Sequence, residues 1–186
     1  MPPKVKTQKE DIIRAAVDLV RAQGCDGLNA RNLAAALQCS TQPIFSNFPS
    51  MEVLRMAVVE AADALSQQYI AEEIRSNRYP PYKASGMAYI RFAKEEPELF
   101  HLLYMRDRTS ETVPEETSLG QQMETMVQGN TGLDSQDAKL FHLEMWAWVH
   151  GIAVMIATGF LDLGQELISR MMTDVYQGLK KQHEKE

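Results

Sequence analysis

The sequence contains few cysteines, and their spacing matches no known chemical pattern. Cys25 and Cys39 are the only two among 186 residues, and they form neither a CxxC metal pair nor a framework of several disulfides. Reduced, buried thiols are the simpler interpretation. We therefore expect a fold without structural disulfides, and neither a metal ion nor a cofactor.

Long apolar runs and a secretory leader are also missing. The longest apolar region, MWAWVHGIAVMIATGFL, is interrupted by His150, Gly151 and Gly159, so it is better interpreted as a buried helix than as a membrane span. The N-terminal segment MPPKVKTQKED has basic residues but no apolar stretch after them. We expect a cytoplasmic protein with no membrane association.

Positive charge is scarce, but its distribution is uneven. The net charge is −6, yet residues 1–60 hold seven Lys or Arg and six Asp or Glu, a net charge of +1, while the remainder carries −7. Residues 32–54 contain no Lys or Arg. The acidity therefore belongs to the C-terminal part and does not exclude an anionic partner for the N-terminal part.

No stretch shows a trustworthy strand-like alternation, whereas apolar residues recur at helical spacing along the whole chain. Gly24 is suited to end the first helix, and Pro80-Pro81 and Pro97 separate later ones. The pattern predicts an all-α fold of about nine helices, over residues 8–23, 29–37, 40–48, 50–77, 81–95, 97–105, 118–128, 135–158 and 164–181.

Two short helices joined by a turn at Gln38-Cys39 form the feature most suggestive of function. Asn29 can cap the first of them, and Ser40 can cap the second, with Pro43 at its third position. In the second helix Ile44 and Phe48 share a face that we expect to be buried, with Phe45 beside them. In a helix-turn-helix the early residues of the second helix meet base edges in the major groove. The candidates are Thr41, Gln42, Ser46 and Asn47, whose amides and hydroxyls suit base reading.

The run LNARNLAAALQCSTQPIFSNFPSMEVL resembles the DNA-binding signature of the tetracycline-repressor (TetR/AcrR) family of transcriptional regulators. The resemblance rests on Asn29, Arg31, Leu33, Ala34 and Ser40, on the segment from Phe45 to Ser50, and on Glu52 and Leu54. It covers residues 8 to 60. It implies an all-helical homodimer with an N-terminal DNA-binding domain, here residues 1–49, and a ligand-binding and dimerisation domain, here residues 50–186. The helix over 50–77 would link the two.

Three positions depart from the family pattern. Gln38 stands where the turn usually has Gly, Phe45 where Tyr is usual, and Met51 where Lys is usual. Phosphate anchoring is therefore expected to be thin. It would depend on Arg31 and an N-terminal arm with Lys4, Lys6 and Lys9, and a contribution from Arg55 stays open. The full set of expected DNA-binding residues is Lys4, Lys6, Arg31, Ser40, Thr41, Gln42, Phe45, Ser46, Asn47 and Met51.

The last two helices look too apolar to form the outside of a monomer. We predict that they pair with their symmetry mates in a dimer interface that includes Met155, Leu167, Ile168, Met171, Met172 and Val175. The segment Trp148-Val149-His150-Gly151 resembles a Trp-x-His-Gly motif from the regulatory domain of one branch of the family. Met and aromatic residues predict an adaptable apolar effector pocket lined by Met87, Phe100, Leu103, Tyr104, Phe141, Met145, Trp148 and His150, although ordinary core packing explains each of them equally well.

An enzyme and a helical protein-protein adaptor are the two alternatives to a regulator. An enzyme is disfavoured, because no HExxH, glycine-rich phosphate loop or nucleophile elbow is present. A helical protein-protein adaptor stays open, but it would need neither a polar helix over 41–47 nor a basic arm. We therefore expect a repressor that a small apolar molecule releases from DNA by tilting the linking helix. The sequence identifies neither the molecule nor the operator.

Overall fold

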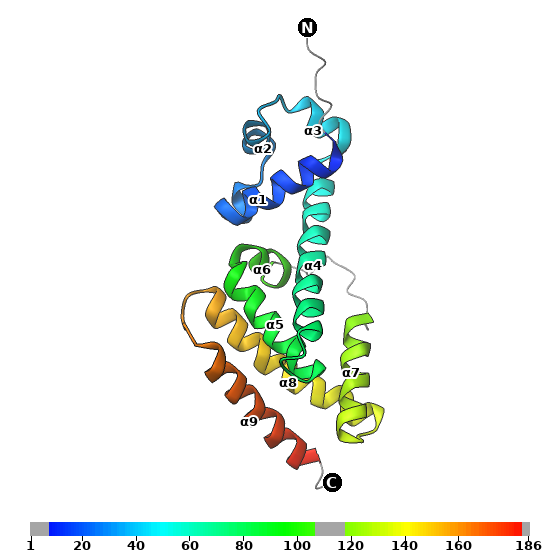
Figure 1. The fold of residues 1–186 in the computed structure, drawn as a ribbon. Helices are drawn as coiled ribbons and strands as arrows, with labels where there is room; N and C mark the ends of the chain where they lie inside the picture. The colour runs from blue at the N-terminus through cyan, green and yellow to red at the C-terminus, as the bar shows by residue number, and fades with distance from the viewer. Residues whose placement is uncertain (1–7, 107–117, 184–186) are drawn as a thin grey trace. The chain divides into compact units, whose positions relative to one another are not determined.

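The computed structural model describes residues 8–106 and 118–183, and all regular secondary structure within them is helical (Figure 1). This confirms the predicted all-α fold. The helices are α1 (Lys9–Gly27), α2 (Ala30–Ala36), α3 (Gln42–Asn47), α4 (Met51–Arg75), α5 (Pro81–Glu95), α6 (Pro97–Tyr104), α7 (Ser118–Thr131), α8 (Ser135–Ala157) and α9 (Gln165–His183).

The chain divides into two compact units. The described part of unit 1 comprises residues 8–67 and 96–106, and that of unit 2 comprises residues 68–95 and 118–183. Helix α4 contributes to both, and α6 belongs to the N-terminal unit although it follows α5 in the chain. The functional boundary expected at residues 49 and 50 stays a prediction.

The core of unit 1 forms where the inward faces of its short helices meet. Ile12, Ala16 and Val20 recur every four residues on α1 and are fully buried, as helical periodicity predicts. Helices α2, α3, α4 and α6 add Leu33, Ile44, Leu54 and Leu99, also fully buried. The Arg21 guanidinium donates two hydrogen bonds of 2.8 Å to the Glu96 carboxylate, which ties α1 to α6. The buried side chains thus form one apolar core that holds α1, α2 and α3 together.

Unit 2 is built around the packing of α5 on α8, with α7 and α9 against the same pair. The core side chains are large, among them Phe92, Phe141 and Met145. At Gly86 an added Cβ would lie 3.1 Å from the Cε atom of Met172, so glycine leaves room on α5 for the α9 side chain. Gly86 therefore allows α5 and α9 to approach closely at this point.

Several local predictions were wrong. Helix α3 begins at Gln42, with Thr41 rather than Ser40 at the N-cap and Pro43 within the first turn. Gly24 has the expected positive φ of +70°, yet α1 resumes after this kink and ends at Gly27. Phe45, expected beside the buried face, is 47% exposed. Both cysteines are free, but Cys25 is exposed rather than buried.

Candidate nucleic-acid interface

The turn between α2 and α3 is fixed by backbone geometry. Before the turn, Asn29 caps the N-terminus of α2, as predicted. Its side-chain oxygen accepts a 2.9 Å hydrogen bond from the Asn32 backbone N–H. After α2 the backbone N–H of Cys39 donates to the Ala34 carbonyl at 3.0 Å, and Gln38 takes a φ of +51°. That is the left-handed region that favours glycine, so the turn keeps its shape with a residue that strains it.

Helix α3 presents two chemically different faces. Ile44 and Phe48, four residues apart, are buried in unit 1. Thr41, Gln42 and Ser46 are exposed. The polar side chains are therefore directed to solvent because the apolar ones are anchored below, and the exposed ring of Phe45 adds an aromatic contact surface to the same helix.

The polar residues of α3 are not equivalent, which the sequence did not reveal. The hydroxyl of Ser46 donates to the Gln42 carbonyl at 2.9 Å, and the side-chain amide of half-buried Asn47 donates to the Pro43 carbonyl at 2.8 Å. Both donors are thus engaged by the helix itself. Gln42 therefore has the side chain best suited to bidentate pairing with a base.

Few cations surround this helix. Arg31 on α2 is exposed. The ammonium of Lys9 lies 5.4 Å above the ring of Phe48, close enough for a cation–π interaction. Arg55 lies on α4, 4.0 Å from the carboxylate of Glu52, and its guanidinium donates a long 3.5 Å hydrogen bond to the Leu28 carbonyl.

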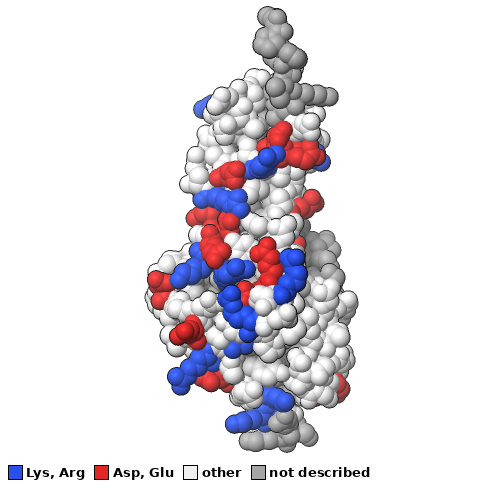
Figure 2. Space-filling view, viewed as in Figure 1, with Lys and Arg blue, Asp and Glu red and all other residues white. Residues whose placement is uncertain are grey.

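The other expected DNA-binding residues differ in position. Lys4 and Lys6 lie outside the described residues. Ser40 is exposed in the turn, and Met51 is half-buried where α4 begins. On the face drawn in Figure 2, the surface near the N-terminal end shows few charged side chains. This agrees with the sequence, in which Arg31 is the only charged residue between 27 and 51.

The predicted effector-pocket residues are distributed between the two units. Phe100, Leu103 and Tyr104 belong to unit 1, and Met87, Phe141, Met145, Trp148 and His150 belong to unit 2. Tyr104, Trp148 and His150 are half-buried and the others are buried. A single cavity lined by all of them stays a prediction.

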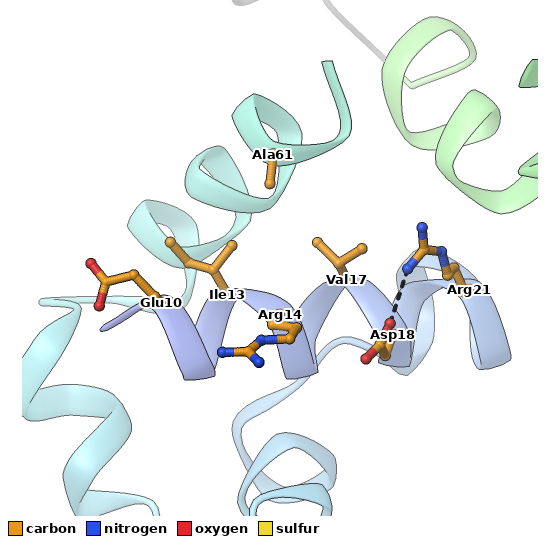
Figure 3. A pocket seen from close by; sticks show the side chains of 7 residues that line it. All are labelled: Glu10, Ile13, Arg14, Val17, Asp18, Arg21 and Ala61. Carbon is orange, nitrogen blue, oxygen red and sulfur yellow. Dashed lines mark hydrogen bonds and ion pairs between the residues drawn. The ribbon is translucent and has the colours of Figure 1, made fainter. Parts of the chain in front are cut away.

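The structure also describes two open grooves, and none of the expected effector residues lines either of them. One, of about 330 Å³, lies in unit 1 between α1 and α4 (Figure 3), and its lining includes Ile13, Val17 and Ala61. The other, of about 440 Å³, lies on α7 beside Gln121 and Thr125.

His150 is held in a contact network that sequence reasoning missed. Its Nδ1 atom lies 2.9 Å from the Tyr89 hydroxyl in a hydrogen bond, and its ring stacks on Trp146 with centroids 5.0 Å apart. A second such bond, of 3.0 Å, joins His142 to Tyr82. Burial lowers the pKa of both imidazoles. The two tyrosines on α5 and the two histidines on α8 are each about two helical turns apart, but this spacing alone does not show that the two helices pack together.

The expected dimer-interface residues fall into two groups. Met155 and Leu167 are exposed, and Met171 and Val175 are half-buried. Ile168 and Met172 are buried within their own unit, so they support this surface from below instead of forming it. Further exposed apolar side chains lie on α8, namely Leu140, Leu143 and Trp146.

Helix α8 is also the one described helix that is long and apolar enough to cross a membrane by length and composition. Core helices of soluble proteins pass the same test. One face of α8 is buried against its neighbours and carries Phe141, Met145 and Val149. The apolar composition is therefore accounted for by packing on this face and by the exposed surface on the other.

Residues 82–175, half of the chain, match the tetracyclin repressor-like C-terminal domain. The chain belongs to the tetracycline-repressor-like family. The matched range contains the Trp148-Val149-His150-Gly151 segment, whose motif assignment stays a prediction. No curated protein matches the chain in sequence.

Solved structures of other proteins share the fold over most of the chain. A TetR-like transcriptional regulator from Rhodococcus sp. RHA1 is 14% identical, with a TM-score of 0.69 over 95% of this chain and 96% of that one. A TetR family member from Streptomyces coelicolor A3 is 18% identical, with a TM-score of 0.58 over 88% and 95%. The multidrug binding protein EbrR, complexed with imidazole, is 16% identical, with a TM-score of 0.57 over 91% and 92%. The chain therefore has a TetR-like transcriptional-regulator fold.

Proposed function

We propose that the protein is a cytoplasmic DNA-binding transcriptional repressor that acts as a homodimer and is released from its operator by a small apolar molecule. The observation that carries this proposal is the geometry of α3. Ile44 and Phe48 anchor the helix in unit 1, and Gln42 stands exposed on its first turn. This is the arrangement expected of a recognition helix in the major groove.

The charge pattern around α3 supports base reading over simple attraction to phosphates. No acidic residue lies between 27 and 51, so nothing there would repel the DNA backbone, and Arg31 supplies one cation per protomer. The amide of Gln42 can donate to N7 and accept from N6 of adenine at the same time. Specificity would therefore come from Gln42 and Thr41, with Arg31 and the arm lysines, Lys4 and Lys6, contributing salt-dependent affinity.

The homodimer is supported by the exposed apolar side chains of α8 and α9. Leu140, Leu143 and Trp146 on one helix and Leu167 on the other would be costly to leave in water. Pairing these helices with their symmetry mates can bury the roughly 1,600 Å² of a standard interface. A twofold axis would then present two α3 helices to a pseudo-palindromic operator, with half-sites about 34–36 Å apart or at a larger spacing.

Release by an effector is supported by the composition of unit 2 and by the course of α4. Met87, Met145 and Phe141 form an adaptable apolar interior, and α4 contributes residues to both units. A molecule that binds unit 2 more tightly in a DNA-incompatible conformation would shift the population away from the operator. The effector would therefore be small and largely apolar.

The experiment is a selection of bound sequences from random double-stranded DNA, followed by affinity measurements on the selected operator. Gln42→Ala should weaken operator binding by about 1–3 kcal/mol and relax the preference at one position of each half-site. Arg31→Ala should weaken binding to all sequences alike and make the salt dependence shallower. Lys180→Ala at the end of α9 is the matched control and should change neither. Failure of the full-length protein to enrich any sequence would exclude the repressor assignment.

A further inference from the structure

The open groove of unit 1 lies on the face of α1 that faces away from the core. Ile13 and Val17, four residues apart, point from α1 toward the turn of α4 that carries Ala61 (Figure 3). All three side chains are half-buried, whereas Ile12 and Ala16 on the inner face of α1 are fully buried. The groove therefore offers an apolar floor that the core of unit 1 does not use.

Four charged side chains follow one another along this groove with alternating sign. They are Glu10, Arg14, Asp18 and Arg21. The outer pair, Glu10 and Arg21, and the inner pair, Arg14 and Asp18, are both centred next to Ala16. A second α1 laid antiparallel about a twofold axis near Ala16 would thus meet opposite charges at all four positions. A parallel helix in the same register would meet like charges.

These charges are accessible and already oriented. The side chains of Arg14 and Asp18 are 70% and 62% exposed. Arg14 donates to Asp11 at 2.6 Å, which holds its guanidinium along the helix. Arg21 donates to Asp18 at 3.0 Å, and its guanidinium also donates the two 2.8 Å hydrogen bonds to Glu96 on the α6 side of unit 1. The four lining charges alone sum to zero.

We propose that this groove docks the α1 helix of a second copy of the chain in an antiparallel, twofold-symmetric contact. Ile13 and Val17 pack against their counterparts over Ala61, and Arg14 meets the partner's Asp18 twice, once on each side of the axis. The contact is distinct from the α8–α9 surface, so it joins dimers rather than making them. Its use in regulation rests on the proposed function, because it would let two dimers bind neighbouring operators together.

The contact is small. About three helical turns pack on a shallow floor, so the buried area is below the roughly 1,200 Å² of a standard interface. Association in solution is therefore weak and salt-sensitive, since exposed ion pairs are screened. On DNA that carries adjacent operators, the second dimer is held at a high effective concentration, so the same contact produces cooperative binding.

The decisive test is a charge swap measured by sedimentation velocity of the full chain over a concentration series at low salt. The wild type should associate beyond its basic assembly as concentration rises. Arg14→Asp and Asp18→Arg each place like charges opposite each other twice, and each should weaken this association about tenfold or more. The double variant R14D/D18R restores opposite charges and should recover it. Circular dichroism and thermal melting show that each variant is folded.

Two further experiments distinguish a failure of this inference from a failure of the proposed function. A mixture of the wild type with R14D/D18R should form fewer mixed assemblies than either protein forms alone, because like charges then face each other. On DNA with one operator all variants should bind equally, whereas on two adjacent operators only the wild type and the double variant should bind cooperatively. If the wild type does not bind DNA, the proposed function is refuted. The sedimentation result then still decides whether the groove docks a second copy of the chain. A wild type that never associates, or single reversals that associate as well as the wild type, would overturn the inference.

Discussion

The Tyr89 hydroxyl and His150 Nδ1 lie 2.9 Å apart in a hydrogen bond that joins α5 to α8. About two turns earlier on both helices, the Tyr82 hydroxyl and His142 Nδ1 form the same kind of bond at 3.0 Å. Burial is the first cause of the lowered pKa of both imidazoles. The folded state therefore favours neutral histidine more strongly than the unfolded chain does, which makes stability depend on pH.

We expect the protein to lose stability as the pH falls below the ordinary histidine pKa of 6.5. Between that value and the lower pKa of each folded imidazole, the unfolded chain binds protons that the folded chain does not, so acid shifts the equilibrium toward unfolding. Urea denaturation at pH 7.5 and pH 5.5 measures the loss. The variant H142Q/H150Q should show a smaller difference between the two pH values, and an unchanged difference would contradict this account.

Gln38→Gly should stabilise unit 1. The left-handed φ of +51° costs a residue with a Cβ roughly 1–2 kcal/mol, and part of the relief is offset by the greater freedom of glycine in the unfolded chain. We expect a net gain of about 0.5–1 kcal/mol, or about 1–4 °C in the melting temperature. The matched control is Ala35→Gly on α2, three residues earlier, which should destabilise by about 0.5–1 kcal/mol. A Gln38→Gly protein that melts at or below the wild-type temperature would show that the turn is not strained.

Local signals predicted the helices well. Helix α5 has the predicted bounds of 81 and 95, because Pro81 starts it and Pro97 opens the next helix. Short elements were harder. Six residues of α3 contain too few apolar positions to fix its first residue, and the exposed ring of Phe45 could not be distinguished from a buried one.

Helix α3 and its solvent-facing Gln42 could be predicted because Ile44 and Phe48 set the orientation of the helix. Contacts between residues that are far apart in the sequence could not be predicted. The Arg21–Glu96 ion pair spans 75 positions in the sequence, and the Tyr89–His150 bond spans 61. No local period encodes such pairs. The sequence also could not distinguish Asn47 from Gln42 as a base-reading residue, because the hydrogen bond of Asn47 to its own helix depends on a side-chain rotamer.

Glu73 should be the most important charged residue for the stability of unit 2. Its side chain is only 5% exposed, and its two carboxylate oxygens lie 3.8 Å from the guanidiniums of Arg78 and Arg91. Arg91 in turn lies over the ring of Tyr69, whose hydroxyl donates to Glu95 at 2.9 Å. Removing the buried charge would leave the arginines without their shared partner.

We expect Glu73→Gln to destabilise the protein by about 1–3 kcal/mol, because both arginines lose the carboxylate that they share. Arg78→Gln should cost less than about 1 kcal/mol, since the Arg78 side chain is 56% exposed. Urea unfolding of Glu73→Gln, Arg91→Gln and the double variant completes a thermodynamic cycle. A coupling below about 0.5 kcal/mol, or a Glu73→Gln protein more stable than the wild type, would mean that desolvation of the carboxylate outweighs its pairing.

The scarcity of cations near α3 predicts a shallow salt dependence of operator binding for a regulator of this family. Residues 32–54 contain no Lys or Arg, so the neutralised phosphates depend on Arg31, Lys9 and the arm lysines, Lys4 and Lys6. Each phosphate contact contributes about 0.9 to the slope of log affinity against log salt. Operator titrations between 50 and 200 mM salt, about the range over which such slopes are usually compared, measure it.

Deleting residues 1–6 should weaken operator binding strongly and reduce the slope by about 3–4 per dimer, because four lysines are lost from the two arms. Replacing Lys4 and Lys6 with Gln should reproduce the change in slope with the length of the arm unchanged. Lys180→Gln with Lys181→Gln, at the far end of α9, removes the same charge from unit 2 and should leave the slope as it is, since those lysines would not meet phosphates. An arm deletion that binds the operator as well as the full chain would assign the phosphate contacts to Arg31 and Lys9 alone.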